Sequence, residues 1–176
     1  MSKIFVVSDT HFSHKNICKF VKEDGEKLRP WDDVNEMDKD LISFWNEVVD
    51  NNDVVYHLGD VCLSRKGLNV VRELNGIKIL IKGNHDNFEL GYYTKYFTDV
   101  QGCMLIEDAV LTHIPVHSSQ LEDWSRAKYN IHGHLHHKFV KDVNGIPDTR
   151  YFNASLENIN FRPIDIDEVF AKMRDK

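Results

Sequence analysis

The stretch "IKILIKGNHD" (residues 77–86) is the most informative part of this sequence. Its first six residues alternate as a β-strand does, with isoleucine at every second position. Gly83 then opens a turn that carries an amide, an imidazole and a carboxylate in succession (residues 84–86). In open α/β sheets, ligands gather outside the carboxyl ends of the strands. If a ligand binds at this end of the sheet, other strands of the chain should also end in polar residues of these kinds.

Other predicted strands end in the same kinds of side chain. In the first half, residues 4–7 and 53–58 have the apolar character of buried strands. In the second half, residues 109–112 and 129–133 have a similar character. The polar residues that follow these segments are Asp9 and His11, Asp60, His113, and His134 and His136. If the strands lie parallel and side by side, their carboxyl ends converge, so we expect one cluster of carboxylates, imidazoles and an amide.

Helical patterns separate and follow these strands. Apolar residues recur at helical spacing over residues 34–49, after a candidate capping residue, Asp32 or Asp33. Residues 67–75 form a second predicted helix, and residues 165–176 form a closing one. The charged stretch at 21–31 is a predicted loop.

The second half is richer in hairpin signals. Residues 102–113 read as two strands joined at Glu107-Asp108, and Asn144-Gly145 is a strong turn signal for a hairpin. Strand–helix alternation followed by hairpins favours an α/β sandwich of mixed sheets with helices outside. At 176 residues, we expect a single domain covering residues 1–176.

Composition narrows the function classes. The formal net charge of −6 does not favour a nucleic-acid partner or an acidic membrane surface, because such surfaces are usually basic. No apolar run approaches membrane-spanning length, and the start "MSKIFVVSD" is too short for a signal peptide. Cysteines 18, 62 and 103 form no CxxC pair, which favours a reducing compartment. We therefore expect a cytoplasmic protein with no membrane partner.

The candidate cluster has the side chains that divalent first-row metals prefer. Two Asp, one Asn and four His are enough for two metal ions with Asp60 shared, and no thiolate is among them. Two such ions, about 3.5–4 Å apart, can hold a water or hydroxide, lower its pKa and stabilise an in-line displacement at phosphorus. Alternate residues of an extended segment point the same way, so the Asp9-x-His11 and His134-x-His136 spacings are expected to aim pairs at one site. The chemistry predicted is phosphate ester hydrolysis.

The motifs resemble those of the calcineurin-like metallophosphoesterase superfamily, in its small single-domain bacterial and phage form. They appear in the family's order, as Asp9-x-His11, Gly59-Asp60, Gly83-Asn84-His85-Asp86, His113 and Gly133-His134-x-His136. The resemblance implies an α/β fold, a four-layer α-β-β-α sandwich of two mixed sheets flanked by helices. It also implies two divalent metal ions, for which we expect manganese, with iron, zinc, cobalt or nickel as alternatives.

The family pattern implies a role for each motif residue. The residues implied for the first metal are Asp9, His11 and His136. Those implied for the second are Asn84, His113 and His134. Asp60 would bridge the two ions, and His85 would contact the phosphate and protonate the leaving oxygen.

Several further residues have competing interpretations. Candidate substrate-binding residues are His14, Asn16, Asn84 and His117, with turn or loop roles as the alternative for His14, Asn16 and His117. The family's larger members have an acidic residue that orients the catalytic histidine, but the matching position here is Leu63. Asp86 is expected to cap the next short helix rather than to take that role. We expect His57 and His132 to be structural interior residues. His137 is expected to be exposed, and so is Arg29, for which contact with an ester phosphate is the alternative.

Four functions remain open on these grounds. We expect a phosphodiesterase acting on small phosphate esters such as nucleotides or cyclic nucleotides. A phosphomonoesterase is the second possibility within the same chemistry, and a nuclease is a weaker one because no basic track is evident. A catalytically idle, metal-binding interaction scaffold is the alternative from a different class, although the presence of His85 argues against it.

Overall fold

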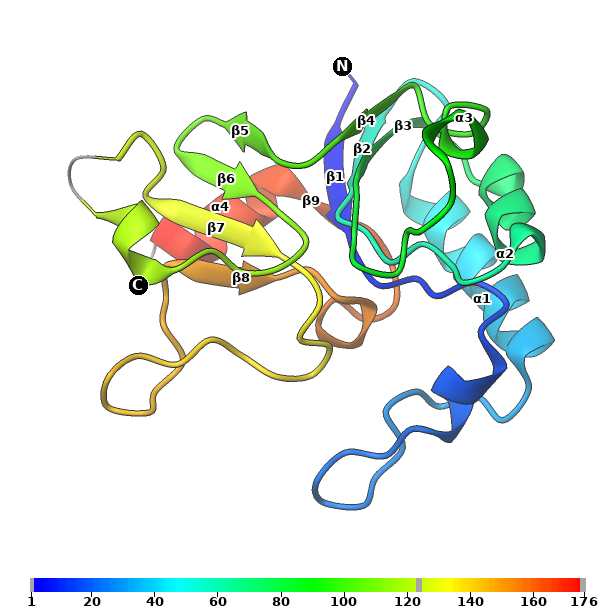
Figure 1. Ribbon diagram of the computed structural model, residues 1–176, viewed down its shortest axis with the longest axis horizontal. Coiled ribbons are helices and arrows are strands. Elements are labelled where there is room, and N and C mark those ends of the chain that lie inside the picture. The colour runs from blue at the N-terminus through cyan, green and yellow to red at the C-terminus, as the bar shows by residue number, and fades with distance from the viewer. Residues whose placement is uncertain (1, 123–124, 175–176) are drawn as a thin grey trace.

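The computed structural model describes residues 2–122 and 125–174, and it contains two mixed β-sheets (Figure 1). The larger sheet has the strand order β4-β3-β2-β1-β9. Its strands are β1 (Ile4–Val7), β2 (Val54–His57), β3 (Ile77–Ile81), β4 (Asp99–Gln101) and β9 (Ile164–Asp165). Strands β1 to β4 are parallel and β9 is antiparallel to β1, so the first three predicted strands end at one edge.

The smaller sheet comes from the second half of the chain and has the order β5-β6-β7-β8. Its strands are β5 (Met104–Ile106), β6 (Ala109–Leu111), β7 (Tyr129–His132) and β8 (Tyr151–Asn153). Strands β5 and β6 form the antiparallel pair predicted around Glu107-Asp108, and β6, β7 and β8 are parallel. Each sheet thus has a parallel set whose carboxyl ends can supply a site.

Helices flank the two sheets, as predicted. The α-helices are α1 (Val34–Val48), α2 (Arg65–Val70), α3 (Leu90–Tyr93) and α4 (Ile166–Arg174). Short 3-10 helices cover Lys15–Lys19 (η1), Val71–Glu73 (η2), Ser118–Leu121 (η3) and Leu156–Asn158 (η4). In Figure 1, α1, α2 and α3 lie beside the larger sheet, and α4 lies behind the smaller one. None of the described helices has the length and apolar character needed to span a bilayer.

Two apolar clusters hold these layers together. One joins the larger sheet to α1 and α2, with Phe5, Leu41, Trp45 and Leu68 among its buried members. The other joins both sheets to α4, and its buried members include Val6, Leu58, Ile131 and Phe170. Phe5 and Val6 serve different clusters because successive side chains of a strand point to opposite faces. The core therefore fixes the two sheets against each other and brings their strand ends together.

Several predicted boundaries hold, and others shift for local reasons. Asp33 caps α1, since its side chain accepts hydrogen bonds from the backbone N–H groups of Asn35 and Glu36. The predicted helix at 67–75 begins earlier, at Arg65, because Ser64 caps it, and it becomes 3-10 after Val70.

Other expectations are corrected or extended. The hairpin at Asn144-Gly145 is reduced to a turn with a single bridge, because the Asp142 side chain accepts from the backbone of residues 144 and 146. Strands β4 and β9 were not predicted, and the short helix expected after Asp86 is α3, which begins only at Leu90. Residues 175–176 of the predicted closing helix lie outside the described residues.

Candidate metal centre

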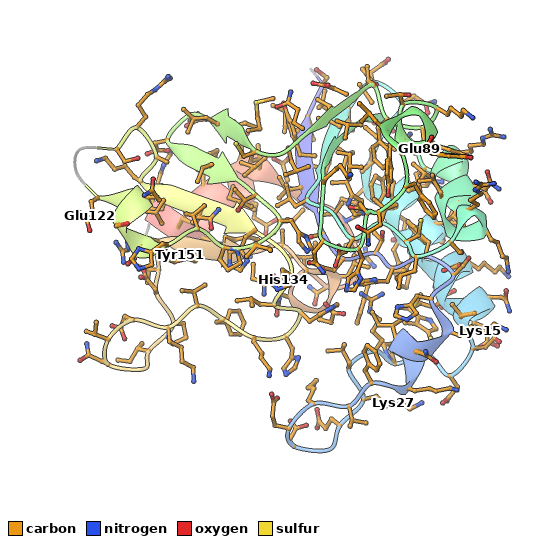
Figure 2. The ribbon with its side chains drawn as sticks, in the orientation of Figure 1. Lys15, Lys27, Glu89, Glu122, His134 and Tyr151 are labelled. Carbon is orange, nitrogen blue, oxygen red and sulfur yellow. The ribbon has the colours of Figure 1, made fainter. Side chains whose placement is uncertain are left out.

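The motif residues converge between the two sheets, where Figure 2 shows His134. Two groups of three side chains each offer ligand atoms that lie within 4.8 Å of one another. The first cluster consists of Asp9, His11 and His136. The second cluster consists of Asp60, His113 and His134. Asn84 adjoins the second, with its Oδ1 atom 2.9 Å from Nε2 of His113. All seven predicted ligands therefore meet, as the sequence predicts.

Asp60 lies between the clusters. Its Oδ2 atom is 3.8 Å from Nε2 of His11 and 3.4 Å from Nε2 of His113. Its other oxygen, Oδ1, accepts a hydrogen bond from the backbone N–H of His85 at 2.8 Å. Burial raises the pKa of this carboxyl, but its hydrogen bond with His113 and the charge of that ring lower it to about 2. One oxygen of an ionised carboxylate therefore faces both clusters.

The backbone around the cluster adopts an unusual conformation. Five of the candidate ligands have positive φ, with values of 58° at Asp9, 50° at His11, 56° at Asp60, 68° at His134 and 50° at His136. A non-glycine residue in this region costs about 1–3 kcal/mol and is retained where the surroundings enforce it. The prediction that the Asp9-x-His11 and His134-x-His136 segments are extended is therefore wrong. Left-handed turns, not strand alternation, direct these pairs at the site.

Buried atoms of the first cluster lack protein partners and fit a cation. Asp9 is fully buried, and its Oδ2 atom accepts from the backbone N–H of His134 and from the Ser155 hydroxyl, both at 2.9 Å. Its Oδ1 atom and both ring nitrogens of His11 have no hydrogen-bond partner among the described residues. Burial raises the pKa of Asp9 and lowers that of His11 well below its usual value. A divalent ion would satisfy these orphaned acceptors, so the donor set fits a metal.

Two glycines make room for the carboxylates. A Cβ atom on Gly133 would lie 1.9 Å from Oγ of Ser8 and 2.5 Å from Oδ2 of Asp9. A Cβ atom on Gly83 would lie 2.3 Å from Oδ1 of Asp60. These motif positions require glycine because the backbone of one loop touches a carboxylate of another.

Asp86 joins two of the loops. The expectation that it caps the next helix is wrong, since its buried carboxylate accepts from the backbone N–H groups of Asp60 at 2.8 Å and Val61 at 3.1 Å. It also accepts from Gly83 N–H at 2.8 Å. Burial raises its pKa to about 6, against the effect of these hydrogen bonds. The residue thus clamps the loop after β2 to the loop after β3.

Arg29 and Glu157 are the functional candidates that the sequence did not reveal. Arg29 is 1% exposed, so the prediction of an exposed loop residue is wrong. Its Nε atom lies 2.8 Å from Oε1 of Glu157, and the same oxygen lies 3.2 Å from Nδ1 of His136. Glu157 ends the segment "YFNASLE" (residues 151–157), which lies outside the motifs that indicated the site.

The predicted catalytic and substrate residues fall into two places. His85 is exposed, and its ring lies 5.9 Å from that of His11. His14, in the turn before η1, has its ring 5.6 Å from that of His11, and Asn16 follows it as an exposed residue. Among the described residues, none hydrogen-bonds to the ring of His85. The exposed side chain of Leu63 offers that ring no polar partner.

His117 is not brought to the centre. It lines a separate cavity of about 580 Å³ with Pro115 and Tyr151, and its ring caps η3 through the backbone N–H of Ser119. Figure 2 shows Tyr151 well apart from His134. A role for His117 in substrate binding stays a prediction.

The remaining histidines are mostly interior, as expected. His57 is buried, accepts from Gly59 N–H at Nδ1, and its Nε2 lies 2.9 Å from the Thr10 hydroxyl. Nδ1 of buried His132 lies 2.7 Å from the carbonyl oxygen of Gly133. His137 differs from expectation, since it is only half-buried and pairs with Glu23 at 2.8 Å.

This arrangement agrees with what the chain resembles among known proteins. Residues 2–154 match the model of the calcineurin-like phosphoesterase superfamily domain. The chain belongs to that superfamily. Two relatives share much of its length. An uncharacterized protein of Methanocaldococcus jannaschii is 36% identical over 174 residues, covering 95% of this chain and 89% of that protein. The gene 66 protein of Mycobacterium phage L5 is 30% identical over 173 residues, covering 80% of each.

The fold of this superfamily member also has a solved counterpart. A protein of unknown function from Aquifex aeolicus superposes with a TM-score of 0.71, covering 97% of this chain and 98% of that one. At 23% identity, that likeness concerns the fold alone. It confirms the α/β architecture of two mixed sheets with flanking helices.

Proposed function

We propose that this calcineurin-like phosphoesterase hydrolyses phosphodiester bonds in small substrates, with two divalent metal ions as cofactors. The observation that carries the proposal is the position of Asp60, whose Oδ2 atom faces His11 on one side and His113 on the other. A carboxylate shared in this way suits two ions, whereas a single ion would leave half of the candidate ligands without a role. The mixed oxygen and nitrogen donors admit manganese, iron, zinc, cobalt or nickel, and we favour manganese on the family resemblance.

We assign the candidate residues to metal binding, proton donation and phosphate binding. Asp9, His11 and His136 would hold one ion, and Asn84, His113 and His134 the other. Ions bound there lower the pKa of an attacking water and stabilise the negative oxygens of a phosphate ester. His85, exposed with its ring 5.9 Å from that of His11, would donate a proton to the leaving oxygen. His14, whose ring lies 5.6 Å from that of His11, and Asn16 would bind phosphate oxygens.

Exposure of the centre supports a diester rather than a monoester. Asn84 and His85 are both exposed, so a phosphorus atom held between them can carry substituents on two sides. A nucleotide or cyclic nucleotide fits that description. Three free cysteines, two of them buried, support a cytoplasmic location for the enzyme.

The test compares a model diester, bis(p-nitrophenyl) phosphate, with a model monoester, p-nitrophenyl phosphate, in the presence of Mn²⁺. We expect faster turnover of the diester. His85→Ala should lower turnover by about 100- to 10,000-fold, because proton transfer to the leaving group is lost, while the bound metal content stays unchanged. His137→Ala is the matched control. It removes an imidazole that pairs with Glu23 and belongs to no motif, so the variant should keep full activity.

Faster turnover of the monoester would replace the diester assignment with a phosphomonoesterase. If neither ester is hydrolysed by protein that carries two ions, the chain is a metal-binding scaffold instead.

A further inference from the structure

Glu157 is a buried carboxylate beside the first cluster that belongs to none of the motifs. It lies in η4, directly after β8, and its side chain is 4% exposed. Its Oε1 atom accepts from Nε of Arg29 at 2.8 Å and lies 3.2 Å from Nδ1 of His136. With Nδ1 donating to this oxygen, Nε2 of His136 is left with a free lone pair for a metal ion.

Arg29 connects Glu157 to the turn that carries Asp9 and His11, the other two members of the first cluster. Its Nη1 atom donates to the carbonyl oxygen of Thr10 at 2.9 Å, and its Nη2 atom donates to that of Asp9. The guanidinium therefore holds the turn that carries Asp9 and His11 while it holds Glu157. Three segments that are distant in sequence are joined by this single pair of charges.

The charges of the pair depend on each other. The Glu157 carboxylate and the Arg29 guanidinium lie 2.8 Å apart with both side chains buried, so each charge is balanced by the other. A buried guanidinium without such a partner would be strongly destabilising. Arg29 thus holds the Glu157 carboxylate in place against a candidate metal ligand, His136.

The second cluster has no such arrangement among the described residues. Nδ1 of His113 lies 2.7 Å from the carbonyl oxygen of Leu58, a neutral backbone acceptor. Carboxylate and carbonyl partners both orient a ligating imidazole, but a carboxylate raises its basicity more. The two clusters therefore differ in the acceptor that their histidine Nδ1 atoms contact: a carboxylate at His136 and a backbone carbonyl at His113.

We propose that Glu157, held by Arg29, is a positioning residue for the first cluster, so that ion binding at Asp9, His11 and His136 depends on it and ion binding at the second cluster does not. The inference rests on the dinuclear centre proposed above. It deepens that proposal by making the two metal positions chemically unequal.

The experiment is a Zn²⁺ titration of metal-free protein with ¹⁵N-labelled histidine, followed through the imidazole resonances of His136 and His113. In Glu157→Gln, the affinity reported by His136 should fall by about 10- to 100-fold, the usual effect of losing an outer partner of a metal ligand. The affinity reported by His113 should stay within about threefold of its original value.

The chain offers a matched control. Glu23 pairs with His137, the next residue after His136, at 2.8 Å on the surface. Glu23→Gln removes a glutamate–histidine pair of the same kind and should change neither affinity.

A second variant covers the case in which Glu157→Gln does not fold. Arg29→Gln/Glu157→Gln removes both charges together, so it leaves no unpaired buried charge. This double variant should show the same selective loss at His136.

Unchanged affinity at both histidines, or an equal loss at both, would overturn the positioning role while leaving the dinuclear centre intact. Wild-type protein that binds fewer than two Zn²⁺ ions would instead refute the centre and the inference together.

Discussion

The two clusters use similar side chains but are built into the protein in different ways. Each has two buried members and one half-buried histidine. In the first, a buried ion pair of Arg29 and Glu157 contacts His136 and the turn that carries Asp9. In the second, Asn84 is exposed, and the acceptor beside His113 is a backbone carbonyl. We infer that the first position holds its ion more firmly and that the second exchanges ions and meets substrate more readily.

Asp60→Asn should have the largest effect, because it replaces the carboxylate that the two clusters share. An amide at this position offers one neutral oxygen where the carboxylate offers a charged one facing both His11 and His113. Diester hydrolysis should fall by more than about 100-fold, and both ions should bind more weakly. Initial rates and metal content after dialysis measure the two effects. Loss of only one ion with activity retained would show that Asp60 belongs to one cluster.

Gly133→Ala should have an intermediate effect that reaches both clusters, because the loop that must move carries His136 of the first cluster and His134 of the second. The new methyl group would meet Oγ of Ser8 and Oδ2 of Asp9 at 1.9 and 2.5 Å, so the loop after β7 must move. We expect a loss of about 1–3 kcal/mol in the free energy of unfolding, together with weaker ion binding at both clusters. Urea denaturation and the imidazole titration measure these quantities.

Gly102→Ala is the control for that substitution, since a Cβ atom there has no neighbour within 4 Å. Equal behaviour of the two alanine variants would mean that the close approach of Gly133 to Asp9 has no consequence for the site.

His57→Gln should have the smallest effect. It tests a buried histidine that connects the loops that carry the two clusters. His57 joins Thr10 of the first loop to Gly59 of the second, and burial lowers its pKa to about 3. The unfolded chain takes up a proton below about pH 6.5 while the folded chain does not, so stability is lost as the pH falls from 6.5 towards 3.

Between pH 7.5 and 5.5, His57 should account for about 1.4 kcal/mol of that loss in the metal-free protein. Urea unfolding of His57→Gln at both pH values should show a pH dependence smaller by that amount. An unchanged pH dependence would show that His57 is not held neutral in the core.

The same contrast explains how far the sequence could predict the structure. The seven candidate ligands were found because each follows a recognisable strand end and belongs to a short motif. Arg29 and Glu157 were missed because their partnership spans 128 residues and neither lies in a pattern. Strands β4 and β9 were missed because three and two residues are too few to show a period.

The local geometry of the motifs was also beyond the sequence. The positive φ angles of Asp9, His11, Asp60, His134 and His136 are imposed by tertiary contacts and not by residue type. Asp86 illustrates the same limit, since its partners, the backbone N–H groups of Asp60 and Val61, lie 25 or more residues away. Residue identity indicated the site, and long-range packing decided its shape.

The most direct test of the central claim is anomalous diffraction from crystals grown with Mn²⁺, with data collected on both sides of the manganese absorption edge. The account predicts two peaks about 3.5–4 Å apart, with Asp60 between them. One should lie among Asp9, His11 and His136 and the other among Asn84, His113 and His134. A single peak, or peaks away from these side chains, would contradict it.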